Sequence, residues 1–99
     1  MTDTGNLTID RVQSAKTAFL EVLSAKRSLE LDITSCEEID LSGLQLLVSL
    51  LRSSLSGSGK VSFRGAPTEA FNAVLLTAGV IESPCGTAEE VEEKIKAVL

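Results

Sequence analysis

The side chains best suited to chemistry lie in one acidic segment near the middle of the 99-residue chain. Asp32 is followed closely by Glu37, Glu38 and Asp40. Carboxylates at short spacing can act as general acids and bases or bind a metal ion. Their spacing fits no calcium-binding loop, however, and surface loops commonly carry such charges. We therefore interpret them as solvated loop acids and expect no catalytic residue, no metal site and no cofactor.

Other catalytic groups are equally scarce. The sequence has no histidine and no serine in a Gly-x-Ser-x-Gly turn. Residues 56–59 are rich in glycine, but Lys60 is followed by Val61 and not by the Ser or Thr of a phosphate-binding loop. We interpret Cys36 and Cys85 as reduced thiols packed as small apolar groups, and not as a disulfide or a zinc site. The sequence thus predicts a protein that is not an enzyme.

Composition predicts one soluble domain with an aliphatic core, since 43% of the residues are hydrophobic and the only aromatic residues are three phenylalanines. The net charge of −5 disfavours binding to nucleic acids and to anionic membranes. The apolar stretch at 44–51 is too short to span a bilayer, and the first ten residues do not resemble a signal peptide. We expect a cytoplasmic protein without direct membrane insertion.

Alternation and helical periodicity predict the order of the elements. This order is a strand at 6–9, a helix at 10–25, a strand at 28–34, a helix at 42–54, a strand at 60–64, a helix at 67–78, and a final helix from 87, while residues 80–81 could add a short strand. Capping boxes predict Asp10, Ser42 and Thr87 as N-caps, and Gly79 is placed to end the helix before it.

The strand at 28–34 alternates polar and apolar residues without a break, which is typical of a strand with one buried face. A strand covered by helices on both faces would be nearly continuously apolar. The order of elements favours right-handed crossovers and parallel pairing. The predicted fold is a small two-layer α/β domain, with a mixed, mostly parallel sheet and helices mainly on one face.

The second helix is apolar nearly all round. Its core stripe comprises Leu44, Leu47, Val48, Leu51 and Leu55. Leu46 falls almost opposite that stripe, and Leu50 flanks it. Two alternatives stay open: the C-terminal helix buries this second side, or the side is exposed for a partner.

The run of residues 38–47, Glu-Ile-Asp-Leu-Ser-Gly-Leu-Gln-Leu-Leu, resembles the signature of STAS domains, the fold of bacterial anti-sigma factor antagonists. In that family a strand leads to an Asp-(Ser/Thr)-(Ser/Ala)-Gly loop that caps a helix. Residues 7–10 resemble the family's opening strand-to-helix turn, and residues 78–80 its late helix stop. The similarity covers about residues 5–82, so we expect one STAS-like domain over 1–99, with 83–99 as a C-terminal helical extension.

The resemblance implies a non-catalytic regulatory function in signal transduction and transcription. Such domains bind a serine kinase-type anti-sigma factor, and phosphorylation of the hydroxyl residue after the Asp switches binding off. Other relatives are subunits of lipid-transport complexes, so the alternative partner is an ABC-type ATPase. A weak homodimer is a further option. The partner-binding residues that the resemblance and the second helix suggest are Asp40, Leu41, Ser42, Gly43, Leu46 and Leu50.

Two departures from the family pattern affect this interpretation. Leu41 stands where the family has its phosphate acceptor, and the nearest hydroxyl is that of Ser42. Because Ser42 is the predicted N-cap of the second helix, we expect it to stay unmodified and partner binding to be constitutive. Residues 1–5 also leave little chain for the strand with which family members usually begin.

Overall fold

The alternating segments form the centre of a parallel sheet. In a computed structural model that describes residues 2–25, 28–57 and 59–99, β2 (Ser28–Asp32) pairs with β3 (Lys60–Arg64) in parallel. The short β1 (Thr2–Asp3) pairs in parallel with the other side of β2, so the strand order is β1-β2-β3. Every strand pairing in the described residues is parallel, whereas the sequence predicted a mixed sheet.

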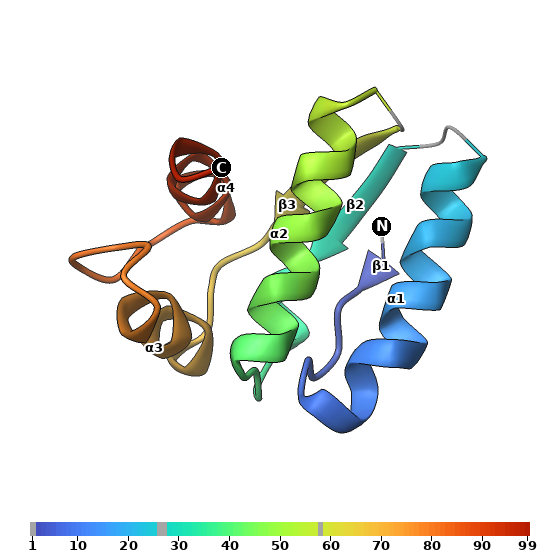
Figure 1. The fold of residues 1–99 in the computed structure, drawn as a ribbon. Coiled ribbons are helices and arrows are strands. Elements are labelled where there is room, and N and C mark those ends of the chain that lie inside the picture. The colour runs from blue at the N-terminus through green and yellow to red at the C-terminus, as the bar shows by residue number, and fades with distance from the viewer. Residues whose placement is uncertain (1, 26–27, 58) are drawn as a thin grey trace.

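The sheet has one buried and one polar face, as predicted. Leu29 and Leu31 lie opposite Val61 and Phe63, and all of them are buried. The alternate positions carry polar side chains, and Glu30 pairs with Arg64 across this outer face at 3.5 Å. Helices α1 (Ile9–Ser24) and α2 (Leu41–Leu55) lie side by side in front of the sheet (Figure 1). The prediction of helices mainly on one face is therefore confirmed.

The remaining helices lie beyond β3. After β3 the chain forms α3 (Glu69–Thr77) and α4 (Ala88–Ala97), on the left in Figure 1. The backbone N–H of Phe63 donates to Glu92 Oε1 at 2.8 Å, and the N–H of Ala88 donates to the Gly65 carbonyl at 3.1 Å. Since β3 is the last strand in the sheet order, α4 covers its free edge.

The core is aliphatic, as expected from the composition. Its largest fully buried side chains come from β2, β3, α2, α3, α4 and the segments that precede α1 and α2. They are Leu7, Leu29, Leu31, Ile33, Leu47, Leu50, Leu51, Phe63, Phe71, Leu75, Val91 and Ile95, with Phe19 on α1 at 3% exposure. Because α4 contributes Val91 and Ile95, it belongs to the same core as the rest of the domain. No described helix has the length and apolar character needed to cross a membrane.

Some local predictions were wrong. Residues 6–9 form no strand; only Leu7 bridges in parallel to Ile39. Residues 80–81 form no strand either, although Ile81 is buried.

Other local predictions were confirmed. Gly79 adopts φ 76°, and the N–H of Val80 donates to the Leu75 carbonyl, as expected after a helix end.

Beyond α2, the predicted loop at 56–59 is described in part, since residue 58 lies outside the described residues. Gly57 and Gly59 both have positive φ there. The N-cap of α4 is Thr87, as predicted, with its hydroxyl accepting from the N–H of Glu90.

Candidate protein-interaction site

The helices α1, α2 and α3 all begin at one edge of the sheet. Each follows the carboxyl end of a strand, and in a parallel sheet these ends lie at the same edge. Figure 1 shows the three starts along the bottom of the view. We call this region the motif edge and define it by residues 8–10, 37–42 and 68–70. It brings the acidic segment and the family signature next to the start of α1.

Asp40 holds two helices at the motif edge. As N-cap of α2, its Oδ1 accepts from the N–H of Gly43 at 3.1 Å. Its Oδ2 accepts from the N–H of Ile9, the first residue of α1, at 2.9 Å. The Thr8 N-cap of α1 makes no capping bond with its own side chain. A single carboxylate therefore supplies side-chain caps to both helices.

This arrangement corrects two predicted caps. Asp10 is not an N-cap: it lies within the first turn of α1 and accepts from the Thr8 hydroxyl. Ser42 is not an N-cap either, because α2 begins at Leu41, one residue earlier. Ser42 is half-buried, and its side chain hydrogen-bonds the Asp40 carboxylate. The expectation that Ser42 stays unmodified because it caps α2 thus loses its basis.

The charge state of Asp40 follows from these contacts. Desolvation raises the pKa of the Asp40 carboxyl, but hydrogen bonds from Gly43, Ile9 and Ser42 together outweigh it and hold the pKa below 3.8, its ordinary value. Asp40 is therefore an anion at neutral pH. An anion between two helix N-termini also interacts favourably with both helix dipoles.

Gly43 allows α2 to approach the segment before α1. A Cβ at this position would collide with the Leu7 carbonyl oxygen and would lie 2.6 Å from the Leu7 Cβ. The same segment is bound by the backbone: the N–H of Leu7 donates to the Glu38 carbonyl at 2.9 Å, and the N–H of Asp40 donates to the Leu7 carbonyl at 3.3 Å. The signature glycine is thus a packing residue that lets the motif loop contact Leu7.

Thr68 fastens α3 to the same edge. Its hydroxyl donates to the Cys36 carbonyl at 2.6 Å and accepts from the N–H of Phe71 at 3.2 Å. The loop before α2 is therefore held by α1 through Asp40 and by α3 through Thr68.

Both cysteines are free and buried, and desolvation raises the pKa of the Cys36 thiol.

The structure separates the predicted partner-binding residues into two groups. Leu41 is 55% exposed, and Asp40 and Ser42 are half-buried beside it. Gly43, Leu46 and Leu50 are buried, with Leu46 at 5% and Leu50 at 1% exposure. Of the two alternatives that the sequence left open for this side of α2, exposure of Leu46 and Leu50 to a partner is therefore wrong.

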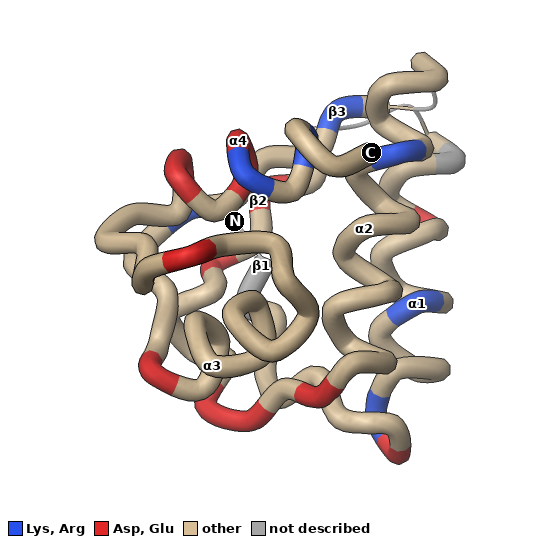
Figure 2. Tube along the Cα trace, turned by 60° about the vertical axis from the view of Figure 1, so that its left-hand side comes forward, with Lys and Arg blue, Asp and Glu red and all other residues tan. Residues whose placement is uncertain are grey.

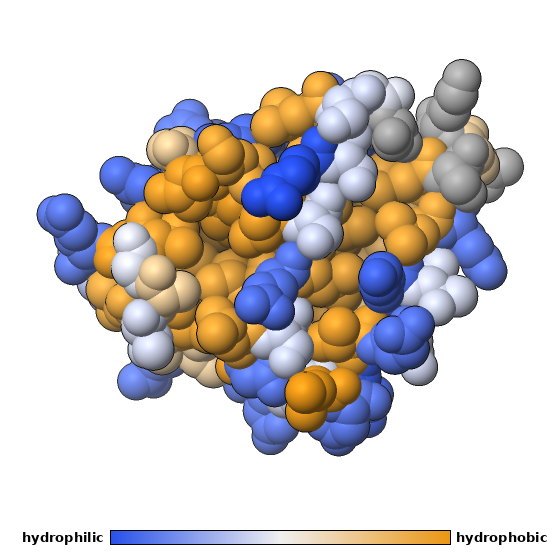
Figure 3. Space-filling view, in the orientation of Figure 1, coloured by the Kyte–Doolittle hydropathy of each residue, from blue (hydrophilic) through white to orange (hydrophobic). Residues whose placement is uncertain are grey.

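The outward side of α2 is polar instead. It carries Gln45, Ser49 and Arg52, all exposed, at spacings of four and three residues. Figure 3 shows a pale and blue stripe along α2, with orange surface on both sides. Leu46 faces α1, and a small hollow of about 210 Å³ between the two helices is lined by both Leu46 and Val12. α2 needs a wide apolar arc because it packs against α1 as well as the sheet. The spacing of Gln45, Ser49 and Arg52 along one side of the helix could have shown in the sequence that this side is the exposed one.

Sequence reasoning missed an apolar groove beside Leu41. The groove lies between the start of α2 and α3, and its volume is about 450 Å³. Its lining is mostly small or aliphatic: Ile39, Leu41, Ala70, Ala73, Val74, Thr77 and Ala78. Ile9, which is 74% exposed, adds a second apolar side chain at the motif edge. One signal in the sequence could have indicated this groove: Leu41 is apolar at a motif position where the family has a polar residue.

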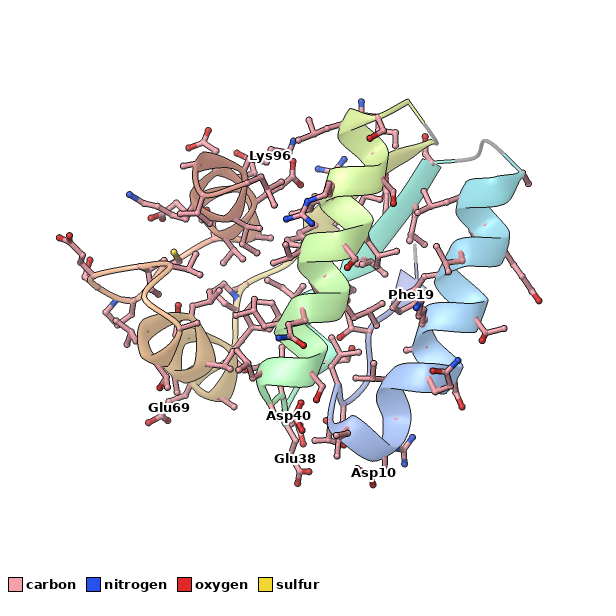
Figure 4. All side chains as sticks on the ribbon, viewed as in Figure 1. Asp10, Phe19, Glu38, Asp40, Glu69 and Lys96 are labelled. Atoms are coloured by element: carbon pink, nitrogen blue, oxygen red, sulfur yellow. The ribbon has the colours of Figure 1, made fainter. Side chains whose placement is uncertain are left out.

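Carboxylates surround these apolar side chains. Asp10, Asp40, Glu38 and Glu69 follow one another along the lower edge in Figure 4, and Figure 2 shows red segments there from α3 to the start of α1. In residues 2–25, 28–57 and 59–99, no group of three or more potential ligands could hold a metal ion. The arrangement is therefore an acidic surface around exposed leucine and isoleucine side chains.

Comparison with protein-family models matches residues 3–82 to the family described as "Mlab, STAS domain". The chain belongs to this STAS family. The resemblance inferred from residues 38–47 is thereby confirmed, and with it the STAS-like fold class. Comparisons with curated proteins and with solved structures found no match. STAS membership supports a regulatory or binding-module class of function, a class that is in general non-catalytic.

Proposed function

We propose that this STAS domain is a non-catalytic, cytoplasmic protein-binding module that binds a serine kinase-type anti-sigma factor at the motif edge. The observation that carries the proposal is Leu41. It is an exposed apolar residue of the family signature, and the Asp40 carboxylate beside it holds the starts of both α1 and α2. Leu41 adjoins the apolar groove between α2 and α3, and a contiguous exposed apolar surface of this kind is typical of protein-interaction sites.

The proposed binding is constitutive. Leu41 has no hydroxyl, so the phosphorylation switch that the family resemblance implies has no acceptor at this position. Phosphate on Ser42 would replace its hydrogen bond to Asp40 with repulsion between two anions. We therefore propose that Ser42 is unmodified in the cell. Mass spectrometry of the native protein tests this, and abundant phosphate on Ser42 would overturn the constitutive interpretation.

A second candidate function is that of a subunit of a lipid-transport complex containing an ABC-type ATPase. The same exposed Leu41 also supports it, because an apolar contact residue suits the stable interface of a subunit. Full burial of an exposed leucine side chain is worth about 1.5–3 kcal/mol, and Leu41, at 55% exposure, would contribute part of that to association. Both candidates use the motif edge, and they differ in the fold and activity of the partner.

The test is capture of the partner by tagged protein from the native cell, with Leu41→Asp as the variant and Leu55→Asp as the control. Leu55 is also exposed on α2, at 62%, but lies at the other end of the helix. Leu41→Asp is expected to lower the affinity for the captured partner at least about tenfold, or ~1.4 kcal/mol. Leu55→Asp is expected to leave it unchanged.

Mass spectrometry then separates the candidates by identifying the captured protein as a kinase-type anti-sigma factor or an ABC-type ATPase. Equal binding by wild type and Leu41→Asp would show that the motif edge is not the interface. A partner of neither class that binds through Leu41 would replace both candidates.

A further inference from the structure

The apolar groove beside Leu41 has a second hollow next to it. This hollow has a volume of about 530 Å³ and is lined by Glu37, Thr68, Glu69, Ala70 and Ala73. Ala70 and Ala73 also line the groove between α2 and α3. The two hollows therefore adjoin at Ala70 and Ala73 along α3, and together we call them the α3 trough, defined by the lining residues of both.

The trough has the dimensions of a helix-binding surface. From Ala70 to Ala78 the helix and its end advance about 12 Å, at 1.5 Å per residue, so roughly two turns of a second helix could lie alongside. Ala73, Thr77 and Ala78 are exposed and small, and Leu41 forms a raised wall on one side. Small residues on one helix allow another helix to approach closely, while Leu41 supplies the apolar contact.

The trough cannot bind a strand by main-chain pairing. Its walls are the helices α2 and α3 with their preceding loops, and none of its lining residues belongs to a sheet strand. An extended segment would place its backbone N–H and C=O groups against alanine and valine side chains without partners. A helix satisfies its own backbone, so it is the form of peptide that fits here.

The charges at the trough determine whether the bound segment is acidic or basic. Glu37 and Glu69 stand at one end of the trough, and neither is in an ion pair within the described residues. Among the described residues that line either hollow, none is Lys or Arg. Acidic segments and anionic lipid surfaces are repelled here, and a second copy of this chain also carries a net charge of −5.

We propose that the α3 trough binds a basic amphipathic helix of the partner protein. Its apolar side chains pack between Leu41 and Val74, and its Lys or Arg side chains lie at the Glu37–Glu69 end. This inference rests on the proposed function and goes beyond it, because it gives the form and charge of the segment that the partner contributes. It also extends the interface from the signature loop onto α3.

Nitrogen-15 NMR of the full chain tests the proposal with two synthetic peptides. One is an amphipathic helix of leucine and lysine, and the other has the same leucines with every lysine replaced by glutamate. The lysine peptide is expected to shift the amide signals of Ala70, Ala73 and Thr77, with an affinity at least about tenfold above that of the glutamate peptide. Its affinity is expected to fall as salt is added.

Matched variants locate the binding. Ala73→Lys places a cation and extra volume in the trough, and is expected to weaken binding of the lysine peptide at least about tenfold. Ala18→Lys makes the same change at an exposed position on α1 and is expected to have no effect. Circular dichroism confirms that both variants fold. Equal affinity for both peptides, shifts confined to α1, or full binding by Ala73→Lys would each overturn the proposal.

The native partner separates this inference from the proposed function. If Leu41→Asp and Ala73→Lys each lose binding of the partner, the proposed function and the α3 trough are both supported. Loss in Leu41→Asp alone leaves the proposed function standing and overturns the α3 trough as part of the interface. Full binding by both variants overturns both.

Discussion

The carboxylate of Asp40 accepts a hydrogen bond at 2.9 Å from the backbone N–H of Ile9, 31 positions earlier in the chain. The same carboxylate caps α2 through Gly43. The start of α1 therefore depends on a residue of the signature loop. A change at Asp40 acts on both helices at once, and on the position of Leu41 between them.

The stability of the fold should depend on pH through Asp40, because its ionised carboxylate caps both α1 and α2. Because hydrogen bonds to the ionised Asp40 carboxylate lower its pKa in the folded state, its contribution is fully present above 3.8, the ordinary value. It is lost as the pH falls below 3.8 through the lower pKa of the folded protein. Urea unfolding of wild type and Asp40→Asn across this range measures the effect.

The two proteins should differ most at neutral pH and converge in acid. Asp10→Asn is the control, because the Asp10 carboxylate accepts from the Thr8 hydroxyl and is the N-cap of neither helix. A constant difference between wild type and Asp40→Asn at every pH would show that the charge of Asp40 is irrelevant.

Gly43→Ala should destabilise the fold in spite of the higher helix propensity of alanine. Propensity alone favours alanine by about 1 kcal/mol. The added Cβ collides with the Leu7 carbonyl oxygen, so α2 or the segment before α1 must move. Overpacking of this kind costs about 1–3 kcal/mol. Denaturant unfolding measures the change, and Gly86→Ala is the control, since its nearest neighbour would be 3.6 Å away. A stabilised Gly43→Ala would contradict the close contact.

Leu46 and Leu41 should respond oppositely to substitution. Leu46→Ala removes a side chain that is 5% exposed, and such truncations cost about 2–5 kcal/mol. Leu41→Ala removes one that is 55% exposed and should change the free energy of unfolding by less than about 0.5 kcal/mol. The partner's affinity should fall only for Leu41→Ala among variants that remain folded. A fully stable Leu46→Ala would return Leu46 to the list of interface candidates.

Glu92 should matter more than its surface position suggests. Its Oε1 accepts from the Phe63 N–H at the edge of β3, and its Oε2 is 3.0 Å from the Lys96 Nζ. Glu92→Ala leaves the Phe63 N–H without its acceptor, at a cost of about 1–3 kcal/mol. Glu92→Gln keeps an acceptor and should lose less. Thermal unfolding of both, with exposed Glu93→Ala as control, tests the contact, and equal stability of all three would refute it.

Patterns with a short range in the sequence predicted most of the fold. The alternation at 28–34 and 60–64 predicted β2, β3 and the single buried face, and the Thr87–Glu90 capping box predicted the start of α4. The predicted cap of α1 was wrong because a capping box considers residues three apart, whereas Ile9 is capped from Asp40, 31 positions later. The predicted cap of α2 was wrong by two residues: Asp40, and not Ser42, makes the local bond, to the N–H of Gly43 three residues on.

The candidate site depended on information of longer range. Periodicity located Leu46 opposite one core stripe, but it could not show that α1 packs there. The signature predicted Leu41 at the interface region, yet the groove needs α3, which Thr68 holds against the loop through Cys36. Residues far apart in sequence meet only once the sheet has brought three helix starts to one edge.

The cover that α4 gives to β3 has a consequence for how fragments of this protein behave. The family match ends at residue 82, before α4 begins. A fragment cut there would lose the buried side chains of Val91 and Ile95 and would leave β3 as an unprotected edge strand, able to pair with strands of other molecules. Such a fragment should aggregate. The last helix thus acts as a built-in guard of solubility, and expression of this domain should include it.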